Sequence, residues 1–578
     1  MPPLHHPRNM PVIRRQHGSG DEALQPSSLI DRLCHARGHT REACERRSLA
    51  DLPDPWQLAG MRPLVKHLAS ALQSAQSILV LGDFDADGAT SSALAVLGLR
   101  AMGAKNVDYL VPNRFDYGYG MSEAIVAEAA LRKPDWIMTV DNGISSHAGT
   151  QYARNLGIGV LITDHHLPGE TLPEADAIVN PCLNDDDFPA RSLAGVGVMF
   201  FVLVALRQHL REQGWFSGER PEPGLADFLD LVALGTVADV VTLDPVNRIL
   251  VHQGMQRIRR AGPRPGIAAL LSIAGRDYRH IDAQDLAFAL APRLNAAGRM
   301  QDMSTGIECL LSDDPHRAGL LAEQLNQMNM ERRQRESEMQ GEALQLLRTD
   351  DGGLDSDAAG LCLYQPGWHQ GIVGILAARI KDRYDRPVIV FADSDSDTLK
   401  GSARSIPSVH IRDTLSDIST RYPDLMTGFG GHAMAAGVTL PRQHLAVFQQ
   451  AFAEAVRQRR TLPATTGILS DGELDESAFS QITARQIQEA GPWGQGFPLP
   501  VFDGTFEVIN NRIVGGRHLK MTLAPEGSRR QIDAIAFQVD APERWIGQSR
   551  IRAAYRLEIN QYQGKERLQM AIEYMETC

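Results

Sequence analysis

Residues 79–88, Leu79-Val80-Leu81-Gly82-Asp83-Phe84-Asp85-Ala86-Asp87-Gly88, decide how the rest of the chain is interpreted. An apolar run ends abruptly in three acidic residues at alternate positions, and Gly88 opens a stretch with helical character. The pattern is typical of a buried parallel strand that turns directly into a helix. In open α/β sheets, ligands bind beyond the carboxyl ends of the strands. Three carboxylates there repel one another unless a cation lies among them; the alternative is a solvated acidic turn with an Asp N-cap.

Further apolar runs end in the same kinds of side chain. Residues 136–140 lead into Asp141-Asn142-Gly143, residues 159–163 into Asp164-His165-His166, and residues 234–238 into Asp239. Because the carboxyl ends of parallel strands meet at one edge of a sheet, we expect these side chains to lie together. Carboxylates with imidazoles, and without thiolates, favour Mn²⁺ or Mg²⁺ over a structural zinc ion. A carboxylate cluster that holds two such ions is the usual arrangement for hydrolysing phosphate esters.

The three motifs Asp85-Ala86-Asp87, Asp141-Asn142-Gly143 and Asp164-His165-His166, in this order, resemble the DHH phosphoesterase superfamily. Residues 82–88 and 234–241 are similar to its RecJ branch, the 5′→3′ exonucleases specific for single-stranded DNA. Many other DHH members carry a His shortly before their first Asp pair. Here that stretch is apolar and Asp83 supplies an extra acid, as in RecJ-like proteins.

The resemblance implies two divalent cations, Mn²⁺ or Mg²⁺, as cofactors. It assigns Asp85 and Asp141 to one ion and Asp87, Asp141, His165 and Asp239 to the other, so that Asp141 bridges the two. Catalytic roles beside the ions, in orienting ligands or the scissile phosphate, fall to Asp83, Asp164 and His166.

Candidates for binding the substrate come from three other stretches. The Gly-rich aromatic loop at residues 111–120 offers Arg114 as a phosphate clamp and Tyr119 as a stacking surface, or it is an ordinary surface loop. Arg299 stands among small residues that suit either phosphate contact or helix packing. The segments around Ser402, Arg404 and His432 resemble a DHHA1 substrate-binding domain, and we expect a helix N-terminus after His432 that binds an anion.

The predicted fold class is α/β, with a C-terminal all-β domain. The alternation of short apolar strands and amphipathic helices after residue 78 predicts a parallel, doubly wound sheet. An unbroken helix from Pro315 to about Arg348 is expected to join two lobes. Its charged face with Arg332, Arg333 and Arg335 is expected to be solvated, and the alternative is that it binds DNA. Strand patterns over residues 501–574 favour a small barrel of the OB-fold type. The expected parts are an N-terminal lead-in (1–50), a DHH catalytic domain (51–262), a helical connector (263–349), a DHHA1 domain (350–462) and an OB-fold (463–578). Residues 1–20 are expected to be disordered, and residues from about 22 to 75 to be helical and connective.

Composition limits the remaining classes. The chain has no apolar run long enough for a membrane span and no secretory signal, and its six scattered cysteines fit reduced thiols in the cytosol. Its formal net charge of −12 argues against a broad basic surface, so contact with nucleic acid must rely on local basic patches.

The resemblance further implies a monomer in the cytoplasm, associated with the nucleoid and acting on single-stranded DNA in repair and recombination. A single-strand-binding protein and a RecQ-type helicase are the expected protein partners. Two alternatives remain: a DHH phosphodiesterase of cyclic dinucleotides or short oligonucleotides, and an inactive DHH scaffold like that of the eukaryotic replicative helicase. The C-terminal barrel disfavours the first, and the full set of ligands disfavours the second.

Overall fold

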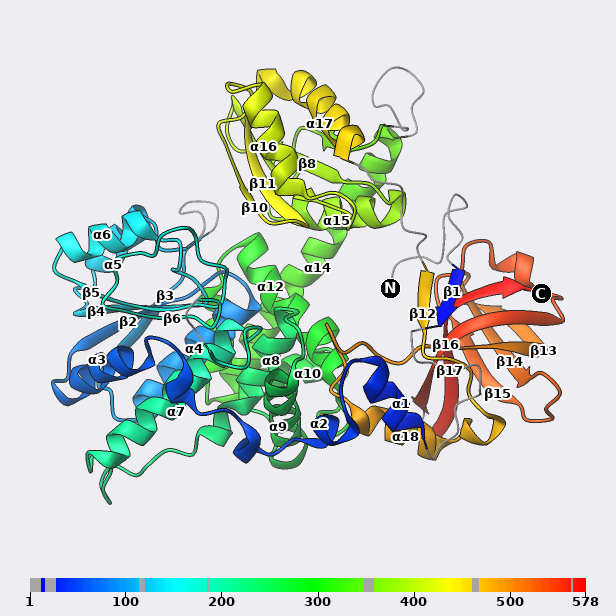
Figure 1. Ribbon diagram of the computed structural model, residues 1–578, viewed down its shortest axis with the longest axis horizontal. Coiled ribbons are helices and arrows are strands. Elements are labelled where there is room, and N and C mark those ends of the chain that lie inside the picture. Colours follow the sequence, from blue (N-terminus) through cyan, green and yellow to red (C-terminus); the bar gives the residue numbers. More distant parts are fainter. Residues whose placement is uncertain are drawn as a thin grey trace.

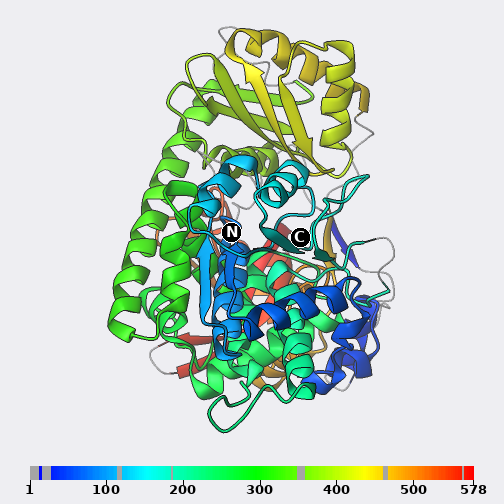
Figure 2. The same ribbon diagram turned by 90° about the vertical axis from the view of Figure 1, so that its left-hand side faces the viewer.

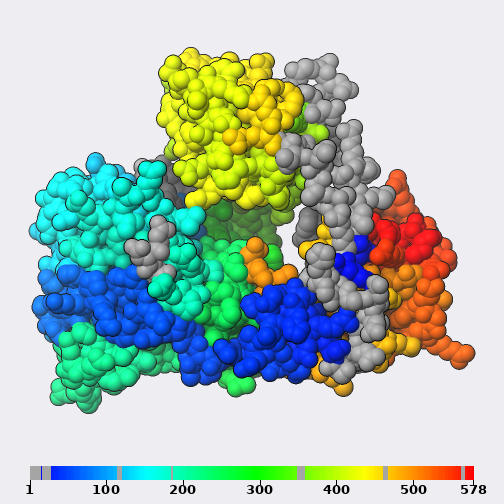
Figure 3. All heavy atoms as spheres, viewed as in Figure 1, coloured from blue at the N-terminus to red at the C-terminus, as the bar shows by residue number. Residues whose placement is uncertain are grey.

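The computed structural model describes residues 12–15, 28–113, 120–183, 187–347, 358–459, 467–562 and 565–578. A parallel-sheet part, a helical connector, a smaller α/β part and a closed β-barrel follow one another along the chain (Figure 1). The predicted fold class is therefore confirmed. Figure 3 shows the surface hollowed beneath the smaller α/β part, where connector residues are visible at depth.

A five-stranded parallel sheet positions the predicted metal ligands. Its strand order is β3-β2-β4-β5-β6. One face packs against α5 and α6, and the other against α3, α4 and α7 (Figure 1). The elements are α3 (Met61–Gln73), β2 (Ser77–Leu81), α4 (Ala86–Ala101), β3 (Asn106–Leu110), α5 (Glu123–Ala130), β4 (Trp136–Val140), α6 (His147–Asn155), β5 (Gly159–Thr163), β6 (Ala177–Val179) and α7 (Gly195–Glu212). The two edge strands, β3 and β6, were not predicted, because they lack the long apolar runs of the central strands.

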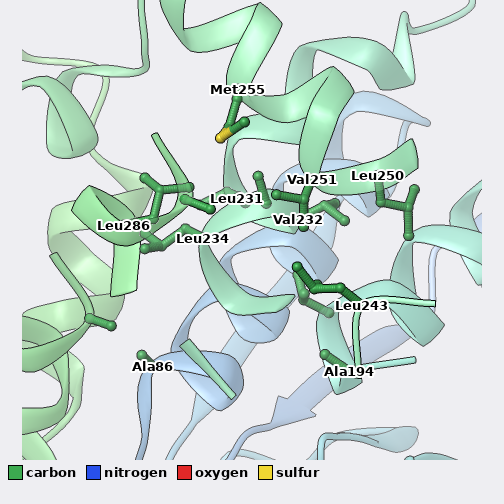
Figure 4. Packing of buried hydrophobic residues seen from close by; sticks show 14 of the residues in the cluster. Ala86, Ala194, Leu231, Val232, Leu234, Leu243, Leu250, Val251, Met255 and Leu286 are labelled. Atoms are coloured by element: carbon green, nitrogen blue, oxygen red, sulfur yellow. The ribbon is translucent and has the colours of Figure 1, made fainter. Parts of the chain in front are cut away.

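A layer of helices packs beside the parallel-sheet part, where α8 contacts α4 and α7. Leu231, Val232 and Leu234 of α8 pack with side chains of α9 in one continuous core (Figure 4). The helices are η3 (Leu225–Phe228), α8 (Leu229–Ala238), α9 (Pro245–Ala261), α10 (Pro265–Ile273), α11 (Ala283–Asp285), the π-helical turn η4 (Leu286–Leu290), α12 (Ala291–Met300), α13 (Ser304–Leu311) and α14 (Pro315–Leu346). Figure 4 also shows Ala86, which lies between Asp85 and Asp87 of the acidic motif and belongs to the same core.

The prediction that residues 1–20 are disordered is wrong for Val12–Arg15. Val12–Arg15 form strand β1, which pairs in parallel with β12 (Gly467–Ser470), and Ile13 packs on the barrel residues Ala554 and Tyr574. Arg15 also forms an ion pair with the buried Asp503. Next come α1 (Leu29–Ala36), α2 (Arg41–Glu45), η1 (Leu49–Asp51) and η2 (Pro55–Gln57).

The C-terminal barrel closes in the order β13-β14-β15-β17-β16. Its elements are η6 (Glu476–Ala478), α18 (Gln481–Ala490), β13 (Phe502–Val514), β14 (His518–Pro525), β15 (Ile532–Ala536), η7 (Pro542–Trp545), β16 (Arg550–Tyr562) and β17 (Lys565–Thr577). The sequence pattern predicts two strands at residues 501–509 and 512–514, but the structure has the single strand β13 there, with a register shift between Val508 and Asn510. The shift breaks the strict alternation of side chains, which is why the sequence pattern indicates two strands.

The smaller α/β part contains a mixed sheet of order β10-β11-β9-β8-β7. Its elements are β7 (Leu361–Tyr364), α15 (Val373–Tyr384), β8 (Val388–Asp393), β9 (Thr398–Arg404), α16 (Ile411–Arg421), β10 (Gly428–Gly431), β11 (Ala435–Pro441), η5 (Arg442–His444) and α17 (Leu445–Arg459). The predicted helix after His432 is wrong, because this residue lies in the turn between β10 and β11. Burial alternates along β11, with Ala436, Val438 and Leu440 inside, which is the period of a strand.

Helix α14 joins the two lobes, as predicted. Its 32 residues begin after the N-cap Asp314 and span about 48 Å at 1.5 Å per residue. Figure 2 shows it running along one side of the molecule up to the smaller α/β part. The prediction that Arg332 is solvated is wrong: its side chain is 11% exposed and pairs with Glu336, which also accepts from Arg379 of α15.

The distribution of cores distinguishes two bodies. One apolar cluster runs through α1, the parallel-sheet part, the connector and the barrel, whereas the smaller α/β part has clusters of its own. One of these clusters includes Met339 and Ala343 of α14. The barrel is therefore fused to the parallel-sheet part, and α14 carries the other body. Within the described ranges, the structure contains no helix with the length and apolar character needed to cross a membrane.

We predict that Glu336→Gln loosens the contact between α14 and α15. The substitution leaves the buried Arg332 without its counter-charge, which costs about 3 kcal/mol in comparable buried pairs. Amide hydrogen exchange across residues 373–384 measures the loss as a lower free energy of opening. Glu331→Gln is the matched control on the same helix, because its pair with Arg335 is exposed and contributes less than about 1 kcal/mol. Equal effects of the two substitutions would contradict the structural role of Glu336.

Candidate active site

The carboxyl edge of the parallel sheet brings the predicted ligands together. Three groups of side chains each have their ligand atoms within 4.8 Å of one another: Asp83, Asp85 and Asp141; Asp141, His165 and His166; and Asp87, His165 and Asp239. Asp141 and His165 each belong to two groups, so the groups form one continuous cluster. Within this cluster, carboxylate oxygens of Asp83 and Asp141 lie within 4.8 Å of each other, which is close enough for both to reach one ion.

Asp141 and His165 carry the clearest sign of a missing partner. Their facing atoms, Oδ1 and Nε2, are 3.0 Å apart, yet the geometry is not that of a hydrogen bond, and neither buried atom has a hydrogen-bond partner. His165 Nε2 also lies 3.5 Å from Asp239 Oδ2. Buried polar atoms are normally satisfied, so a cation coordinated by these atoms explains their arrangement.

The backbone holds Asp141 in a strained position. Its φ of +62° lies in the left-handed region, which non-glycine residues rarely adopt. The first residue of α7, Gly195, passes so close that an added Cβ would lie 2.6 Å from the Cβ of Asp141. Strain of this kind is stored at functional sites, and here it aims the carboxylate into the cluster.

The two acids of the first motif also cap helices. Asp85 is the N-cap of α4 and accepts from the Gly88 N–H through Oδ1 at 2.9 Å. Asp87 is 1% exposed, and its two oxygens accept from the backbone N–H groups of Gly195 and Val196 at the start of α7, at 2.7 and 3.0 Å. The alternative of an acidic turn with an Asp N-cap is thus partly right for Asp85. The turn is not solvated, however, because Asp83 and Asp87 are buried.

Asp164 orients His166. One oxygen of the buried Asp164 accepts from Nδ1 of His166 at 2.7 Å and from two backbone N–H groups, and the other accepts from the Ile144 N–H at 2.9 Å. Asp164 belongs to none of the three ligand groups of the described residues, so its role is to position the imidazole. Burial would lower the pKa of His166, but the hydrogen bond and charge of Asp164 raise it to about 9.

The electrostatics of the cluster fit divalent cations. Burial, followed by the charges of neighbouring aspartates, raises the pKa of Asp141, and burial with the charges of Asp87 and Asp85 does the same for Asp239. Burial lowers the pKa of His165 to about 4, which leaves its imidazole neutral and able to coordinate. Carboxylates that are costly to ionise together, beside a neutral imidazole, are a donor set for Mn²⁺ or Mg²⁺.

Helix α12 supports the acidic loop, and our sequence analysis missed this contact. Asn295 Oδ1 accepts from the Ala86 N–H at 2.8 Å. Gly298 packs so closely that a Cβ would lie 1.8 Å from the carbonyl oxygen of Phe84. Both residues stand in the stretch noted for Arg299, and an Asn among small residues was the only signal that could have pointed to them.

A continuous path of contacts leads from the acidic loop to the second lobe. Arg299 donates to the carbonyl of Gly371 at 3.2 Å, two residues before α15 begins. Arg404 donates to Ser402 Oγ at 3.1 Å, and both side chains lie against Gly374 in the first turn of α15. A helix N-terminus, a hydroxyl group and a guanidinium group thus converge on one place. Such a combination binds a phosphate group.

The remaining predicted substrate contacts differ in their placement. His432 is exposed, and its hairpin belongs to the same sheet as Ser402 and Arg404. On that sheet Gly437 pairs with Ser402 and with Gly430, and nothing lies within 4 Å of the Cβ position of either glycine. Bare backbone is therefore open to a ligand beside Ser402. Arg114 and Tyr119 lie outside the described residues.

Comparison with known proteins places these parts in families. Residues 77–236 match the DHH family N-terminal domain, residues 357–458 match the DHHA1 domain, and residues 470–574 match the RecJ OB domain.

Whole-chain relatives agree with these matches. The single-stranded-DNA-specific exonuclease RecJ of Escherichia coli K12 is 50% identical over 551 residues, which cover 94% of this chain and 95% of the relative. The protein of the same name from Haemophilus influenzae is 46% identical over 98% of this chain and 99% of its own length. The crystal structure of RecJ from Thermus thermophilus in complex with Mn²⁺ superposes with a TM-score of 0.77 at 29% identity, covering 95% of this chain and 76% of that one.

We predict that Gly298→Ala weakens binding of Mn²⁺ by tenfold or more, measured by isothermal titration calorimetry. The added Cβ cannot fit against Phe84 and must displace the loop that carries Asp83, Asp85 and Asp87, and a shift of about 1 Å at an active site can cost a hundredfold in activity. Gly341→Ala is the control, since it is also a helical glycine but has nothing within 4 Å of its Cβ position. Unchanged affinity in Gly298→Ala would show that α12 does not set the position of the ligands.

Proposed function

This chain belongs to the RecJ family, and from that premise we propose that it is a metal-dependent exonuclease that degrades single-stranded DNA from the 5′ end. In this proposal the enzyme releases 5′-mononucleotides and acts in DNA repair and recombination. One observation carries the proposal. The ligand cluster with the unsatisfied Asp141 and His165 is joined through α12 to the hydrogen-bond donors of Ser402, Arg404 and the first turn of α15 on the second lobe.

The proposed roles of the side chains follow from their geometry. Asp85, Asp87, Asp141, His165 and Asp239 would hold two divalent ions, and the catalytic roles beside them go to Asp83, Asp164 and His166, of which Asp83 and His166 also lie within the ligand groups. When bound, such ions supply activation of water at neutral pH and stabilisation of charge on the scissile phosphate. His166 Nδ1 is committed to Asp164, so Nε2 is the atom that can hold a proton beside the 3′ oxygen of the departing nucleotide.

The second lobe gives the enzyme its polarity in this proposal. Ser402, Arg404 and the first turn of α15 grip the terminal 5′ phosphate, and Arg299 fixes the distance between that grip and the acidic loop. A chain end held at a fixed distance from the ions loses one nucleotide in each cycle. His432 and the open backbone around Gly437 contact the first nucleotides in this proposal. Arg114 and Tyr119 are proposed as further contacts to the strand.

The barrel is the proposed binding surface for the following single strand, as expected for an OB-fold. A single-strand-binding protein and a RecQ-type helicase are the proposed partners, because together they generate and present the strand that the enzyme consumes. We place the enzyme in the cytoplasm at the nucleoid, where its substrate lies, as a monomer. The proposed domain boundaries are those expected from the sequence: the lead-in at residues 1–50, the DHH domain at 51–262, the connector at 263–349, the DHHA1 domain at 350–462 and the OB-fold at 463–578.

The first test is the direction of degradation. Single strands labelled at the 5′ or the 3′ end are digested with Mn²⁺, and we expect the 5′ label to leave first as a mononucleotide. Asp141→Asn serves as the inactive control, since it weakens the bridging ligand while preserving its shape. Early loss of the 3′ label would overturn the proposed polarity, and full turnover by Asp141→Asn would overturn the assignment of the ions.

The second test concerns the terminal phosphate. Arg404→Ala should lower kcat/KM on 5′-phosphorylated strands by roughly tenfold to a hundredfold, the value of a charge-assisted hydrogen bond of about 1.5–3 kcal/mol. The loss on 5′-hydroxyl strands should be much smaller. Arg412→Ala, which removes an exposed arginine from the same domain, should affect the two substrates equally. Equal losses in Arg404→Ala would remove this residue from end recognition.

A further inference from the structure

A histidine caps the first turn of α15, where the two lobes meet. The carbonyl oxygen of His369 accepts from the N–H groups of Ile372 and Val373 at 3.0 and 3.3 Å, so helical hydrogen bonding begins at this residue. Its ring nitrogen Nδ1 accepts from the Gly371 N–H at 3.1 Å, as the side chain of an N-cap residue does. An imidazole thus caps the helix end to which we assign the terminal phosphate.

Capping alone does not require an imidazole. Ser, Thr, Asp and Asn are the preferred N-cap residues, because one short side-chain oxygen reaches the backbone N–H group. A histidine brings a second nitrogen to the same place. Since Nδ1 of His369 accepts from a backbone N–H group, the neutral ring carries its proton on Nε2, which makes Nε2 a hydrogen-bond donor.

The ring lies beside the contact between α15 and α12. A Cβ atom added to Gly371 would lie 3.1 Å from Cε1 of His369 and 2.2 Å from the carbonyl oxygen of Arg299. The Arg299 guanidinium group donates in turn to the Gly371 carbonyl at 3.2 Å. Cε1 is bonded to both ring nitrogens, so the edge of the ring that carries them is the edge next to this contact.

The neighbouring residues fix the backbone on both sides of the ring. Trp368 is 5% exposed, and its Nε1 donates to Glu342 of α14 at 2.7 Å. The side chain of Gln370 donates to the carbonyl of Asp393, the last residue of β8, at 2.6 Å. His369 itself is partly exposed. A donor that must meet a substrate needs this kind of support, because a small displacement removes most of its effect.

His369 stands between the proposed site for the terminal phosphate and the metal ligands. That site lies against Gly374, three residues beyond Gly371. In the other direction, α12 connects Arg299 to Gly298, which packs on the loop that carries the ligands. Figure 1 shows α12 beneath the part that holds α15. If one nucleotide leaves in each cycle, the phosphate next to the terminal one is cleaved, and it must lie in this interval.

We propose that His369 contacts the scissile phosphate, with Nε2–H donating to a non-bridging oxygen while Nδ1 caps α15. This inference rests on the proposed exonuclease function. A donor held in place before the reaction acts most strongly where charge develops in the transition state. His369 therefore contributes to kcat more than to KM, and its link to Arg299 through Gly371 holds the donor at a constant distance from the metal ligands.

The test uses two substitutions that separate the ring nitrogens. Asn keeps an acceptor at the position of Nδ1 and has no atom at that of Nε2, whereas Gln reaches the position of Nε2 with its amide group. We expect His369→Asn to unfold thermally at the native temperature or above, because Asn is a good N-cap. Its kcat should fall by roughly tenfold to a hundredfold, the effect of one hydrogen bond to a charged group, with KM little changed. His369→Gln should have the higher kcat of the two variants and the lower stability.

A second histidine of the same domain provides the matched control. His410 is the N-cap of α16, and its Nδ1 accepts from the Asp413 N–H at 3.3 Å. His410→Asn should leave kcat unchanged. Each variant is assayed on 5′-phosphorylated and 5′-hydroxyl strands, and His369→Asn should lower kcat equally on both, unlike Arg404→Ala.

The outcomes separate this inference from the function on which it rests. Native kcat in His369→Asn would leave His369 as a cap only and overturn the proposal. A loss confined to 5′-phosphorylated strands would place His369 at the terminal phosphate and overturn its assignment to the scissile one. The proposed function is judged on the native protein: early loss of a 3′ label from that protein would overturn the function itself, whereas normal polarity with a fully active His369→Asn would overturn only the role of His369.

Discussion

The carboxylate of Asp87 joins the chemistry of this protein to its fold. Its two oxygens accept from the first backbone N–H groups of α7, a helix of 18 residues whose apolar side chains fill the main core. Those N–H groups have no partner within the helix, and the helix dipole favours negative charge at that end. The same contact sets Gly195 against Asp141. The position of the ligand cluster is thus fixed by the packing of the lobe.

The sequence was sufficient for the parts of the site that follow from strand periodicity. Apolar runs ending in Asp141 and Asp164 placed both residues on one edge, because parallel strands leave no other arrangement. Contacts between distant segments were not predictable: Asn295 caps the acidic loop from 209 residues away, and nothing local marks it. Arg332 looked solvated because charged residues surround it in sequence, yet its helix face is covered by the second lobe. The Gly-rich run at His432 is compatible with either a helix or a strand after it. The residues that follow are alternately buried and exposed in the structure, as in a strand.

The barrel and the DHHA1 domain are attached to the catalytic lobe in different ways, which matters for an enzyme that must advance along a DNA strand. The barrel shares a core with the catalytic lobe, so the proposed binding surface and the ligand cluster keep a constant distance. The DHHA1 domain has its own core and is carried by α14, with the Arg299–Gly371 contact as a second tie close to the site. A catalytic lobe that is rigidly joined to the barrel, with a DHHA1 domain attached separately, suits stepwise removal of nucleotides. In the proposed mechanism the DHHA1 domain can release a product while the barrel retains the strand.

The acidic character of the chain fits recognition of a strand end. The chain has a formal net charge of −12, and several of the negative charges lie in the ligand cluster, where two divalent ions would neutralise them. Affinity for DNA that rests on many phosphate contacts is insensitive to where along the strand the protein sits. A helix N-terminus with Ser402 and Arg404 instead offers charge-assisted bonds at one place, and a terminal phosphate has more free oxygens to accept them than an internal one. The proposed contact with the terminal phosphate therefore distinguishes the end of a strand from its interior, which favours an exonuclease over an enzyme that cuts internally.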